Sequence, residues 1–521
     1  AQGQDVPVRV QVSESGTYRA FTGKMDMGQG ARALLTQAFA EELSVPVDRV
    51  ELVMGDTLLC PDDGGTWSSL TSPQTVPVIR QAAAAVRASR TGGTDTLTAP
   101  ASWRVLGTSV PRIDSVAIVT GARLYPSDMV PDGVQHAAVV RSPYHAARLV
   151  SFNAATLDGR ADVRLLRDGD LLAVVAADLL TARRAASEVT AEWAPEAVTP
   201  QAEWAEMFKA TAVESVEQPR ARYPPLIVRG DAASALAGAV RRRTASYWAD
   251  PIAHVPLEPR AAVAEWDGDT VTIHGGAQAP FLVRQEVAQA LKVPQQNVRI
   301  IAVDSGGAFG GKQRGECEVE AARIARLAGA PVRVAWTREE EFTCSYTRPA
   351  GLIEVDSAID TDGHIVAMRF ANYNSGAAGL ALPYDIPNQW VGFYRTQSDV
   401  RQGSYRSLAA VANTFARESH MDEWAADLQV DPVEFRLRHI TDDRLREVIE
   451  RTAERFGWGA RAAEGRGFGM SCNLEKDARL ALFVEMEVAG GDARVVRMVA
   501  TGDFGAALNP DTLQNQMTGA L

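Results

Sequence analysis

The chain has 521 residues and a formal net charge of −12, from 53 Lys and Arg against 65 Asp and Glu. This acidic balance argues against a general nucleic-acid binder, because neutralising phosphates requires a basic surface. The length allows about three or four domains, and no run of about 18 apolar residues predicts a transmembrane helix.

The first regular elements follow a short glycine motif. Gly28-Gln29-Gly30 precedes residues 31–43, where apolar side chains recur at helical spacing. After a Val-Pro turn, residues 47–53 have the composition of a strand, and Gly55-Asp56 follows it. The segment therefore predicts helix, turn, strand and loop in that order.

A hydroxyl-rich loop comes next. Residues 66–72 contain several Ser and Thr side chains around Trp67 and Leu70, just before a predicted helix over 76–87. Residues 89–102 are rich in Gly, Thr and Ser and predict a linker. The loop at 66–72 is a candidate cradle for a polar ligand.

Residues 111–200 have a different pattern of apolar residues. Short β-branched or apolar runs at 116–119, 137–140 and 171–175 alternate with one helical stretch at 179–189. This alternation predicts three strands and a helix in a compact α+β domain.

A second segment repeats the first pattern. Residues 281–291 predict a helix, Val293-Pro294 a turn, and residues 298–304 a strand. A glutamine among small residues, Gln278, precedes this helix as Gln29 precedes the first. If the repeat is genuine, two related halves close on one ligand.

The second strand leads into the octapeptide Ser305-Gly306-Gly307-Ala308-Phe309-Gly310-Gly311-Lys312. Its four glycines let the backbone adopt positive φ and approach another molecule closely. Gly306 to Lys312 matches a phosphate loop until Gln313 replaces the Ser or Thr that holds magnesium. The sequence leaves three alternatives open: a nucleotide loop, a structural turn, or a cradle for a different anionic cofactor.

The remaining sequence features say less about function. Residues 218–229 are irregular, and residues 422–456 are helical in composition, with Pro432 at a helix start. The seven histidines show no metal-ligand spacing. The four cysteines lie far apart, which argues against zinc or iron–sulfur sites carried by this chain and favours buried thiols; they are Cys60, Cys317, Cys344 and Cys472.

In combination, these motifs resemble the molybdenum-cofactor subunit of the xanthine dehydrogenase and aldehyde oxidase family. The Gly-Gln-Gly region precedes the octapeptide here, an order similar to that of isoquinoline 1-oxidoreductase and nicotinate dehydrogenase large subunits. The resemblance covers nearly the whole chain and rests on Gly28-Gln29-Gly30, Gly55-Asp56-Thr57, Gln278, Ser305 to Lys312, Gly403-Ser404-Tyr405-Arg406 and Asn509-Pro510.

The resemblance implies an α+β fold. It comprises an α/β-hammerhead domain at 110–200 and two related molybdopterin-binding α+β domains. The first of these spans 225–455, and the second is split between an N-terminal part, 1–100, and a C-terminal part, 460–521.

The resemblance also assigns site residues. Gln278 is similar to the glutamine that hydrogen-bonds a molybdenum oxo ligand, Phe309 to the backbone facing the metal, and Arg406 to the arginine that orients substrate. The pterin dithiolene, not a side chain, would hold the metal. The implied cofactor-binding residues are Gly28, Gln29, Gly30, Ser68, Ser69, Thr71, Gln278, Gly307, Ala308, Phe309, Gly310 and Arg406.

The implied activity is oxidation of an N-heteroaromatic compound or an aldehyde, with water as the oxygen source. Gln313 replaces a glutamate of xanthine-oxidising members, which makes a purine substrate less favoured. Electrons would pass to a [2Fe–2S] partner subunit, and then to a cytochrome c or flavin subunit. The sequence leaves open whether the pterin is a dinucleotide, and whether the protein is cytoplasmic or peripheral to the inner membrane or periplasm; residues 1–5 show no signal sequence.

One element of the family pattern does not occur. The catalytic glutamate lies in a Gly-x-Gly-Glu motif after the Asn-Pro element, and this sequence ends at Leu521 without it. We expect the sequence to be part of a longer polypeptide, with residues 514–521 opening a helix. The alternatives are a non-catalytic cofactor-binding paralogue or carrier and, less favoured, a phosphate-loop NTPase.

For two charged residues, Glu258 and Lys312, the sequence leaves more than one role open. The segment His254-Val255-Pro256-Leu257-Glu258 predicts a pocket wall, with substrate contact by Glu258 as a minor possibility. Lys312 is either a partner of a cofactor phosphate or a solvated surface charge.

Overall fold

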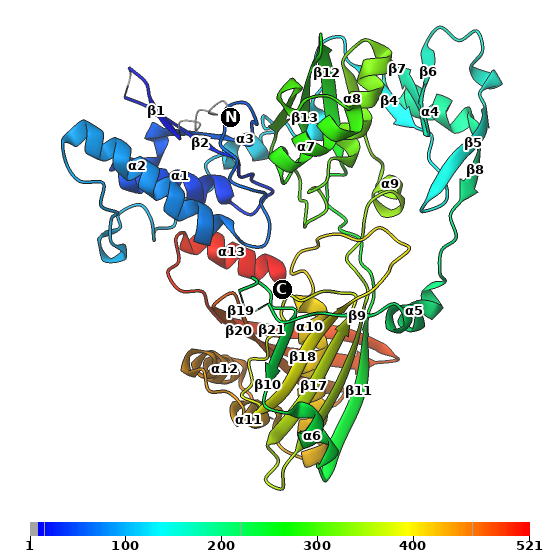
Figure 1. The fold of residues 1–521 in the computed structure, drawn as a ribbon. Helices are drawn as coiled ribbons and strands as arrows, with labels where there is room; N and C mark the ends of the chain where they lie inside the picture. Colours follow the sequence, from blue (N-terminus) through cyan, green and yellow to red (C-terminus); the bar gives the residue numbers. More distant parts are fainter. Residues whose placement is uncertain (1–8, 15, 219, 461) are drawn as a thin grey trace.

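The computed structural model describes residues 9–14, 16–218, 220–460 and 462–521. The signal-sequence expectation for residues 1–5 lies outside these described residues. Figure 1 shows a part built from the N-terminal and central segments and a second part that contains a large sheet, with the last helix between them. None of the helices in the described ranges is both long and apolar enough to cross a membrane.

The N-terminal part contains a β–α–β unit. Strand β2 (Tyr18–Thr22) pairs in parallel with β3 (Val50–Met54), and helix α1 (Ala31–Leu43) connects them. Helix α1 begins after Gly30 at φ 82° and ends at Ser44 at φ 57°, whose N–H bonds the last turn. Strand β1 (Val10–Val12) extends the sheet, and helix α2 (Val76–Thr91) packs on α1.

A second β–α–β unit has the same order. Strand β13 (Thr270–Gly275) pairs in parallel with β14 (Val298–Ala302), and α7 (Pro280–Leu291) connects them. The Thr57 N–H donates to the Ile300 carbonyl at 3.0 Å, and the Ala302 N–H donates to the Gly55 carbonyl at 3.2 Å. The predicted repeat of elements is therefore confirmed, and the two units meet at the carboxyl ends of β3 and β14.

The second unit belongs to a seven-stranded sheet of order β14-β13-β12-β15-β4-β7-β6. Helices α8 (Glu316–Ala328) and α4 (Leu179–Glu188) pack on it, and strands β5 (Ala147–Asn153) and β8 (Thr190–Pro195) form a separate pair. The sheet thus joins strands of the predicted 110–200 and 225–455 segments. Its other strands are β4 (Gln135–Val139), β6 (Val163–Asp168), β7 (Leu171–Ala176), β12 (Ala261–Asp267) and β15 (Val332–Ala335).

One predicted strand is wrong. Residues 116–119 belong to the short helix α3 (Ser115–Val119), although Val and Ile favour strands. Val116 and Val119 are 70% and 82% exposed, so no sheet surface receives their side chains. The Arg123 N–H instead bonds the Ala117 carbonyl at 2.8 Å and closes a compact turn. The Val and Ile side chains favour a strand, but they have no sheet to pack on here.

The second part of the molecule is built on a six-stranded sheet of order β10-β18-β17-β16-β11, with β9 on β18. Helix α10 (Ala410–Leu428) packs on β16 and β11, and α11 (Pro432–Leu437) begins at the predicted Pro432. Helices α5 (Trp204–Ala210), α6 (Ala232–Ala237) and α9 (Arg338–Thr343) are short. The strands are β9 (Val213–Glu214), β10 (Leu226–Arg229), β11 (Arg241–Ala249), β16 (Gly351–Ile359), β17 (Ile365–Tyr373) and β18 (Asn388–Arg395).

The last segment forms a three-stranded antiparallel sheet, with β19 (Arg466–Glu475), β20 (Ala478–Ala489) and β21 (Asp492–Asp503). Helix α12 (Asp443–Phe456) packs on β20 and β21, and Phe456 and Phe483 share one core with the six-stranded sheet. Helix α13 (Pro510–Ala520), predicted from residue 514, lies between this part and α1 (Figure 1).

Buried polar groups connect α10 to this last sheet. Glu418 accepts hydrogen bonds from Arg417 and Arg436, both at 2.9 Å, and these two arginines hold the pKa of the buried carboxyl below its usual value despite desolvation. Arg417 also donates to the Cys472 carbonyl at 3.3 Å. The network fixes β19 against α10 and so positions one wall of the site described next.

The cysteines are free thiols. Cys60, Cys317 and Cys472 are buried, as predicted, and Cys344 is half-buried. No group of three or more His, Cys, Asp or Glu side chains among the described residues could hold a metal ion.

Candidate functional site

A cavity of about 1780 Å³ lies where the two β–α–β units meet the C-terminal segments. Segments far apart in the sequence line it, around residues 27–34, 66–73, 304–313, 404–415, 471–482 and 504–519. Every site residue predicted from the sequence lines this cavity: Gly28, Gln29, Gly30, Ser68, Ser69, Thr71, Gln278, Gly307, Ala308, Phe309, Gly310 and Arg406.

The glycine octapeptide is held by the side chains around it. The Gly306 N–H donates to Glu258 Oε2 at 2.8 Å, and the Gly310 and Lys312 N–H groups both donate to Gln278 Oε1 at 3.2 Å. The Tyr346 hydroxyl donates to the Gly310 carbonyl. These bonds fix the backbone of the loop before any ligand arrives.

Two amide groups of this loop remain available. Within the described part of the chain, no acceptor pairs with the N–H of Ala308 or of Phe309. Ala308 is buried, and Phe309 has φ 54°, a conformation that a bulky L-residue adopts only where the surroundings impose it. A buried, unpaired N–H favours an oxo or other anionic acceptor in the cavity.

The Gln278 side chain connects the two halves of the site. Its Nε2 donates to the Thr66 carbonyl at 3.1 Å, while its backbone N–H donates to the Lys312 carbonyl at 2.8 Å. The Thr66 N–H donates in turn to the Gln278 carbonyl at 2.8 Å. Gln278 therefore contacts both the glycine octapeptide and the loop at 66–72.

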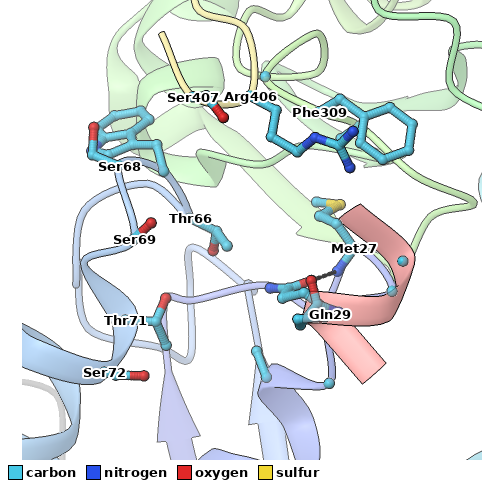
Figure 2. A pocket seen from close by; sticks show the side chains of 18 of the residues that line it. Met27, Gln29, Thr66, Ser68, Ser69, Thr71, Ser72, Phe309, Arg406 and Ser407 are labelled. Carbon is cyan, nitrogen blue, oxygen red and sulfur yellow. Dashed lines mark hydrogen bonds between the residues drawn. The ribbon is translucent and has the colours of Figure 1, made fainter. Parts of the chain in front are cut away.

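Gln29 has a different role from Gln278. Its Oε1 accepts the Met27 N–H at 2.6 Å and its Nε2 donates to the Met25 carbonyl at 3.0 Å (Figure 2). Asp26 Oδ1 accepts the Gly28 N–H at 2.8 Å. The amide of Gln29 thus shapes the turn that brings the N-terminus of α1 to the cavity, where its positive dipole favours an anion.

The hydroxyl-rich loop forms another wall. Ser68 and Ser69 have φ 52° and 58°, two consecutive residues in the left-handed region, and both line the cavity. Figure 2 shows Ser68, Ser69 and Thr71 on the side of the pocket opposite Phe309. Arg222 Nη2 donates to the Ser68 carbonyl at 2.7 Å and ties this loop to the segment before β10. The prediction of irregular structure over 218–229 is wrong at its end, because residues 226–229 form β10 and pair with β18.

Arg406 lies against the glycine octapeptide. Its guanidinium carbon lies 5.2 Å from the centre of the Phe309 ring (Figure 2), and its backbone N–H donates to the Phe309 carbonyl at 2.7 Å. The next two residues, Ser407 and Leu408, have φ 71° and 54°. No carboxylate of the described residues forms an ion pair with Arg406, which leaves its charge available to a ligand.

The ionisable groups around the cavity have a net positive balance. Asp304 is neutralised by Arg32, at 2.9 Å, and by Arg123. Glu475 lines the cavity, and burial raises the pKa of its carboxyl while Lys476 lowers it. The lining cations Arg112, Arg222, Arg406 and Lys476 outnumber the two lining carboxylates, Asp304 and Glu475. The cavity therefore favours an anionic ligand.

Both predictions for Lys312 are wrong. Its side chain is only 3% exposed and does not line the cavity; its Nζ lies 3.3 Å from Glu258 Oε2. The turn at Gly310-Gly311 directs it inward, where its Cδ packs on Gly276. The ammonium group of a phosphate loop would face the ligand, so this geometry does not support the NTPase alternative.

Glu258 does not line the cavity either. Besides Gly306 and Lys312, it accepts the Ser127 N–H at 3.0 Å and the Ser127 hydroxyl at 2.9 Å. The minor alternative of substrate contact by Glu258 is therefore wrong. The carboxylate instead holds the start of the glycine octapeptide.

Sequence reasoning missed the contribution of the C-terminal segments. Leu480 and Leu482 of β20 and Phe504, directly after β21, line the cavity, and Thr512 of α13 packs on Gly30. A Cβ at Gly30 would lie 2.7 Å from the Thr512 methyl carbon. The Asn509-Pro510 motif marked this region, because Asn509 Oδ1 accepts the Thr512 N–H and caps α13, but nothing in its spacing indicated contact with α1.

Known protein families match both parts of the chain that line the cavity. Two family profiles, each described as a molybdopterin cofactor-binding domain, match residues 216–440 and residues 1–95. Together they include the octapeptide, Gln278 and Arg406 on one side and Gln29 and Ser68 on the other.

Individual relatives extend over the whole chain. A nicotinate dehydrogenase subunit of Pseudomonas putida is 28% identical over 99% of this chain and 51% of its own length. The beta subunit of isoquinoline 1-oxidoreductase from Brevundimonas diminuta is 25% identical over 95% of this chain and 70% of its own. The chain thus spans about half the length of the first of these relatives.

A solved structure shares the fold. The aldehyde oxidoreductase of Desulfovibrio gigas matches 90% of this chain and 62% of its own length, with a TM-score of 0.59 and 20% identity. The predicted α+β architecture is thereby confirmed.

Proposed function

Because this chain belongs to the molybdopterin cofactor-binding subunits of the xanthine dehydrogenase and aldehyde oxidase family, we propose that it is the large subunit of a molybdenum hydroxylase. It would oxidise an N-heteroaromatic compound or an aldehyde, with water as the source of oxygen. Electrons would leave to a [2Fe–2S] partner subunit and from there to a cytochrome c or flavin subunit.

One observation carries this proposal. The cofactor-binding residues that the resemblance implies come from segments hundreds of residues apart, yet all of them line one cavity. The cavity presents unpaired N–H groups at Ala308 and Phe309 and a net positive set of side chains. Its volume of about 1780 Å³ exceeds that of usual small-molecule sites and suits a bulky anionic cofactor.

The residues fit a molybdopterin in detail. The N-terminus of α1 at Gly28 to Gly30 and the left-handed pair Ser68 and Ser69 would hold the pterin and its phosphate or nucleotide tail. Ala308 and Phe309 would donate their N–H groups to the metal end of the cofactor. When bound, the molybdenum centre would supply a two-electron oxidant and an activated oxygen derived from water.

Side chains of this protein would orient the substrate and exclude water. Arg406, held by the Phe309 carbonyl and ring, would direct its guanidinium at a polar or anionic group of the substrate. Gln278 would keep the octapeptide in place, and its second Nε2 proton is available to an oxo ligand. The apolar side chains Leu480, Leu482 and Phe504 would limit the access of water.

We also propose the domain division inferred from the sequence. Residues 1–100 and 460–521 would form the two parts of one cofactor-binding domain, residues 225–455 the other, and residues 110–200 the hammerhead. The contact of Thr512 with Gly30 supports the pairing of the first and last segments.

A substrate panel tests the activity. The protein, isolated from its native source with its partner subunits, would be mixed with an artificial dye acceptor and with N-heteroaromatic carboxylates, unsubstituted N-heteroaromatics and aldehydes in turn. We expect dye reduction with at least one class and incorporation of oxygen from ¹⁸O-labelled water. A molybdenum-loaded complex that oxidises none of these classes would favour the non-catalytic carrier.

A further inference from the structure

His254 does not line the cavity; its ring lies between the loop at 403–408 and the glycine octapeptide, against Ser404 and Gly311. We propose that His254 is a positioning residue that sets the orientation of Arg406 by holding the Ser404 carbonyl against the glycine octapeptide. The expected effect of His254 on catalysis rests on the function proposed above. Its expected effect on the order of the loop at 403–408 does not.

The direct contact is a short hydrogen bond. His254 Nε2 lies 2.6 Å from the carbonyl oxygen of Ser404, two residues before Arg406. The Arg406 N–H then bonds the Phe309 carbonyl at 2.7 Å. The Ser404 to Arg406 backbone is therefore held at two points, by an imidazole on one side and by the octapeptide on the other.

The ring of His254 has little freedom to move. It meets Tyr346 edge-on, with 5.1 Å between ring centres, and Tyr405 at 5.3 Å. A Cβ at Gly311 would lie 2.8 Å from His254 Cγ, so the octapeptide backbone packs directly on the ring. The imidazole thus occupies a fixed place between both loops, which is what a positioning group requires.

Burial determines the protonation state of this ring. His254 is 5% exposed, and desolvation lowers the pKa of its imidazole below the usual value, so the ring is neutral at physiological pH. Because Nε2 faces a carbonyl, Nε2 carries the proton. Nδ1 has no hydrogen-bond partner among the described residues. The side chain therefore has one hydrogen-bonding task, donation to Ser404.

The segment that carries His254 is anchored at both ends. Val255 has φ 48°, which is strained for a β-branched residue and persists only where neighbours impose it. At the far end, the Glu258 N–H donates to the Gly306 carbonyl at 3.1 Å and the Glu258 carboxylate accepts the Gly306 N–H. The segment from 254 to 258 thus spans the two loops, with one end on Ser404 and the other on Gly306.

Three substitutions separate the hydrogen bond from the packing. His254→Gln places an amide N–H near the position of Nε2, and the loss of Nδ1 breaks no bond. His254→Leu fills the space without a donor. His254→Asn carries the same amide as Gln but is one methylene shorter and cannot reach Ser404. The Gln and Asn variants form the matched pair.

The first readout needs neither cofactor nor substrate. Hydrogen exchange followed by mass spectrometry would compare peptides that cover residues 402–410 in each variant and in the unsubstituted protein. We expect exchange in this segment to accelerate at least about tenfold in the Leu and Asn variants, which corresponds to about 1.4 kcal/mol, and to remain near the original rate in the Gln variant. Peptides from α12 serve as the internal reference for global stability.

The second readout is kinetic. In cofactor-loaded complexes, Leu and Asn should lower kcat about 10-fold or more with molybdenum content unchanged, and Gln should restore it. Unaltered exchange at 402–410 in Leu and Asn would overturn the proposal, whether or not the complex is active. Faster exchange with unaltered kcat would overturn the link to Arg406. If the unsubstituted complex oxidises nothing, the proposed function fails, while the exchange data still decide the role of His254 in the loop.

Discussion

The backbone N–H of Arg406 donates to the carbonyl oxygen of Phe309 at 2.7 Å, and the Arg406 guanidinium lies over the Phe309 ring. This pair joins the loop at 403–408 to the glycine octapeptide. Gly310 makes the approach possible, because it packs directly on the Ser404 backbone. The orientation of the Arg406 cation therefore depends on backbone contacts that a single methyl group would disturb.

Gly310→Ala should separate the two loops. Gly310 has φ 100°, and a Cβ would lie 2.5 Å from the Ser404 carbonyl oxygen. We expect a loss of about 1–3 kcal/mol in the free energy of unfolding, together with loss of bound cofactor. Urea unfolding and metal analysis measure the two effects.

Gly133→Ala is the matched control for this substitution. Gly133 also has positive φ, at 73°, but no atom lies within 4 Å of its added Cβ. It should show only the smaller backbone cost of about 1 kcal/mol and retain the cofactor. Equal effects of the two substitutions would mean that the contact of Gly310 with Ser404 is unimportant.

Gln278→Ala should impair chemistry more than cofactor retention. The Gly310 and Lys312 N–H groups lose their shared acceptor and the Thr66 carbonyl loses a donor. One preorganised donor removed at a reacting oxygen slows turnover on the order of 10²-fold. Dye-coupled turnover and molybdenum content, measured on the same preparation, check this. Turnover at the original rate would remove Gln278 from the site.

The buried pair of Lys312 and Glu258 should respond asymmetrically to substitution. Lys312→Met leaves the Glu258 carboxylate with donors from Gly306 and Ser127, whereas Glu258→Gln leaves a buried ammonium without a counter-ion. We expect Glu258→Gln to cost about 3–5 kcal/mol in unfolding free energy, and Lys312→Met to cost less. Chemical denaturation measures both, and the reverse order would contradict the described hydrogen bonds.

Glu318 should make stability depend on pH. Burial raises the pKa of its carboxyl from 4.5 to about 7. Between these two values the folded state holds a proton that the unfolded state has lost, so the contribution of Glu318 to stability falls as pH rises towards 7. Charged neighbours also act on this carboxyl: Arg260 and Lys312 lower its pKa, and Glu316 raises it.

Glu318→Gln stays uncharged at every pH and isolates this effect. The variant should match the original protein at about pH 5 and be more stable at about pH 8. Glu447→Gln, at an exposed pair with Arg451, is the control and should show a difference that does not change over this range. A Glu318→Gln difference that is also independent of pH would show that the carboxyl is not protonated in the folded state.

The sequence predicted the components of the site because their chemistry is local. Glycines at 306–311 and at 28–30, and Gln278, are recognisable from neighbouring residues, and the helix–turn–strand repeat follows from apolar spacing. All of them lie where the two β–α–β units meet.

Other features depend on contacts distant in sequence. Lys312 is directed inward by Glu258, which lies 54 positions earlier, and the exposed run at 116–119 is helical because no strand pairs with it. Leu480, Leu482 and Phe504 form an apolar wall because tertiary packing places β20 and the residue after β21 beside the cavity. Tertiary packing decides such cases, and local propensity does not.

We propose above all that the cavity between the two β–α–β units binds one molybdopterin cofactor. The most direct test is the molybdenum and pterin content of the full-length protein purified from its native source, with the metal measured by mass spectrometry and the pterin by fluorescence after oxidation. We predict about one molybdenum and one pterin per polypeptide, and their loss in Gly310→Ala but not in Gly133→Ala. A natively purified protein that contains neither molybdenum nor pterin would contradict it.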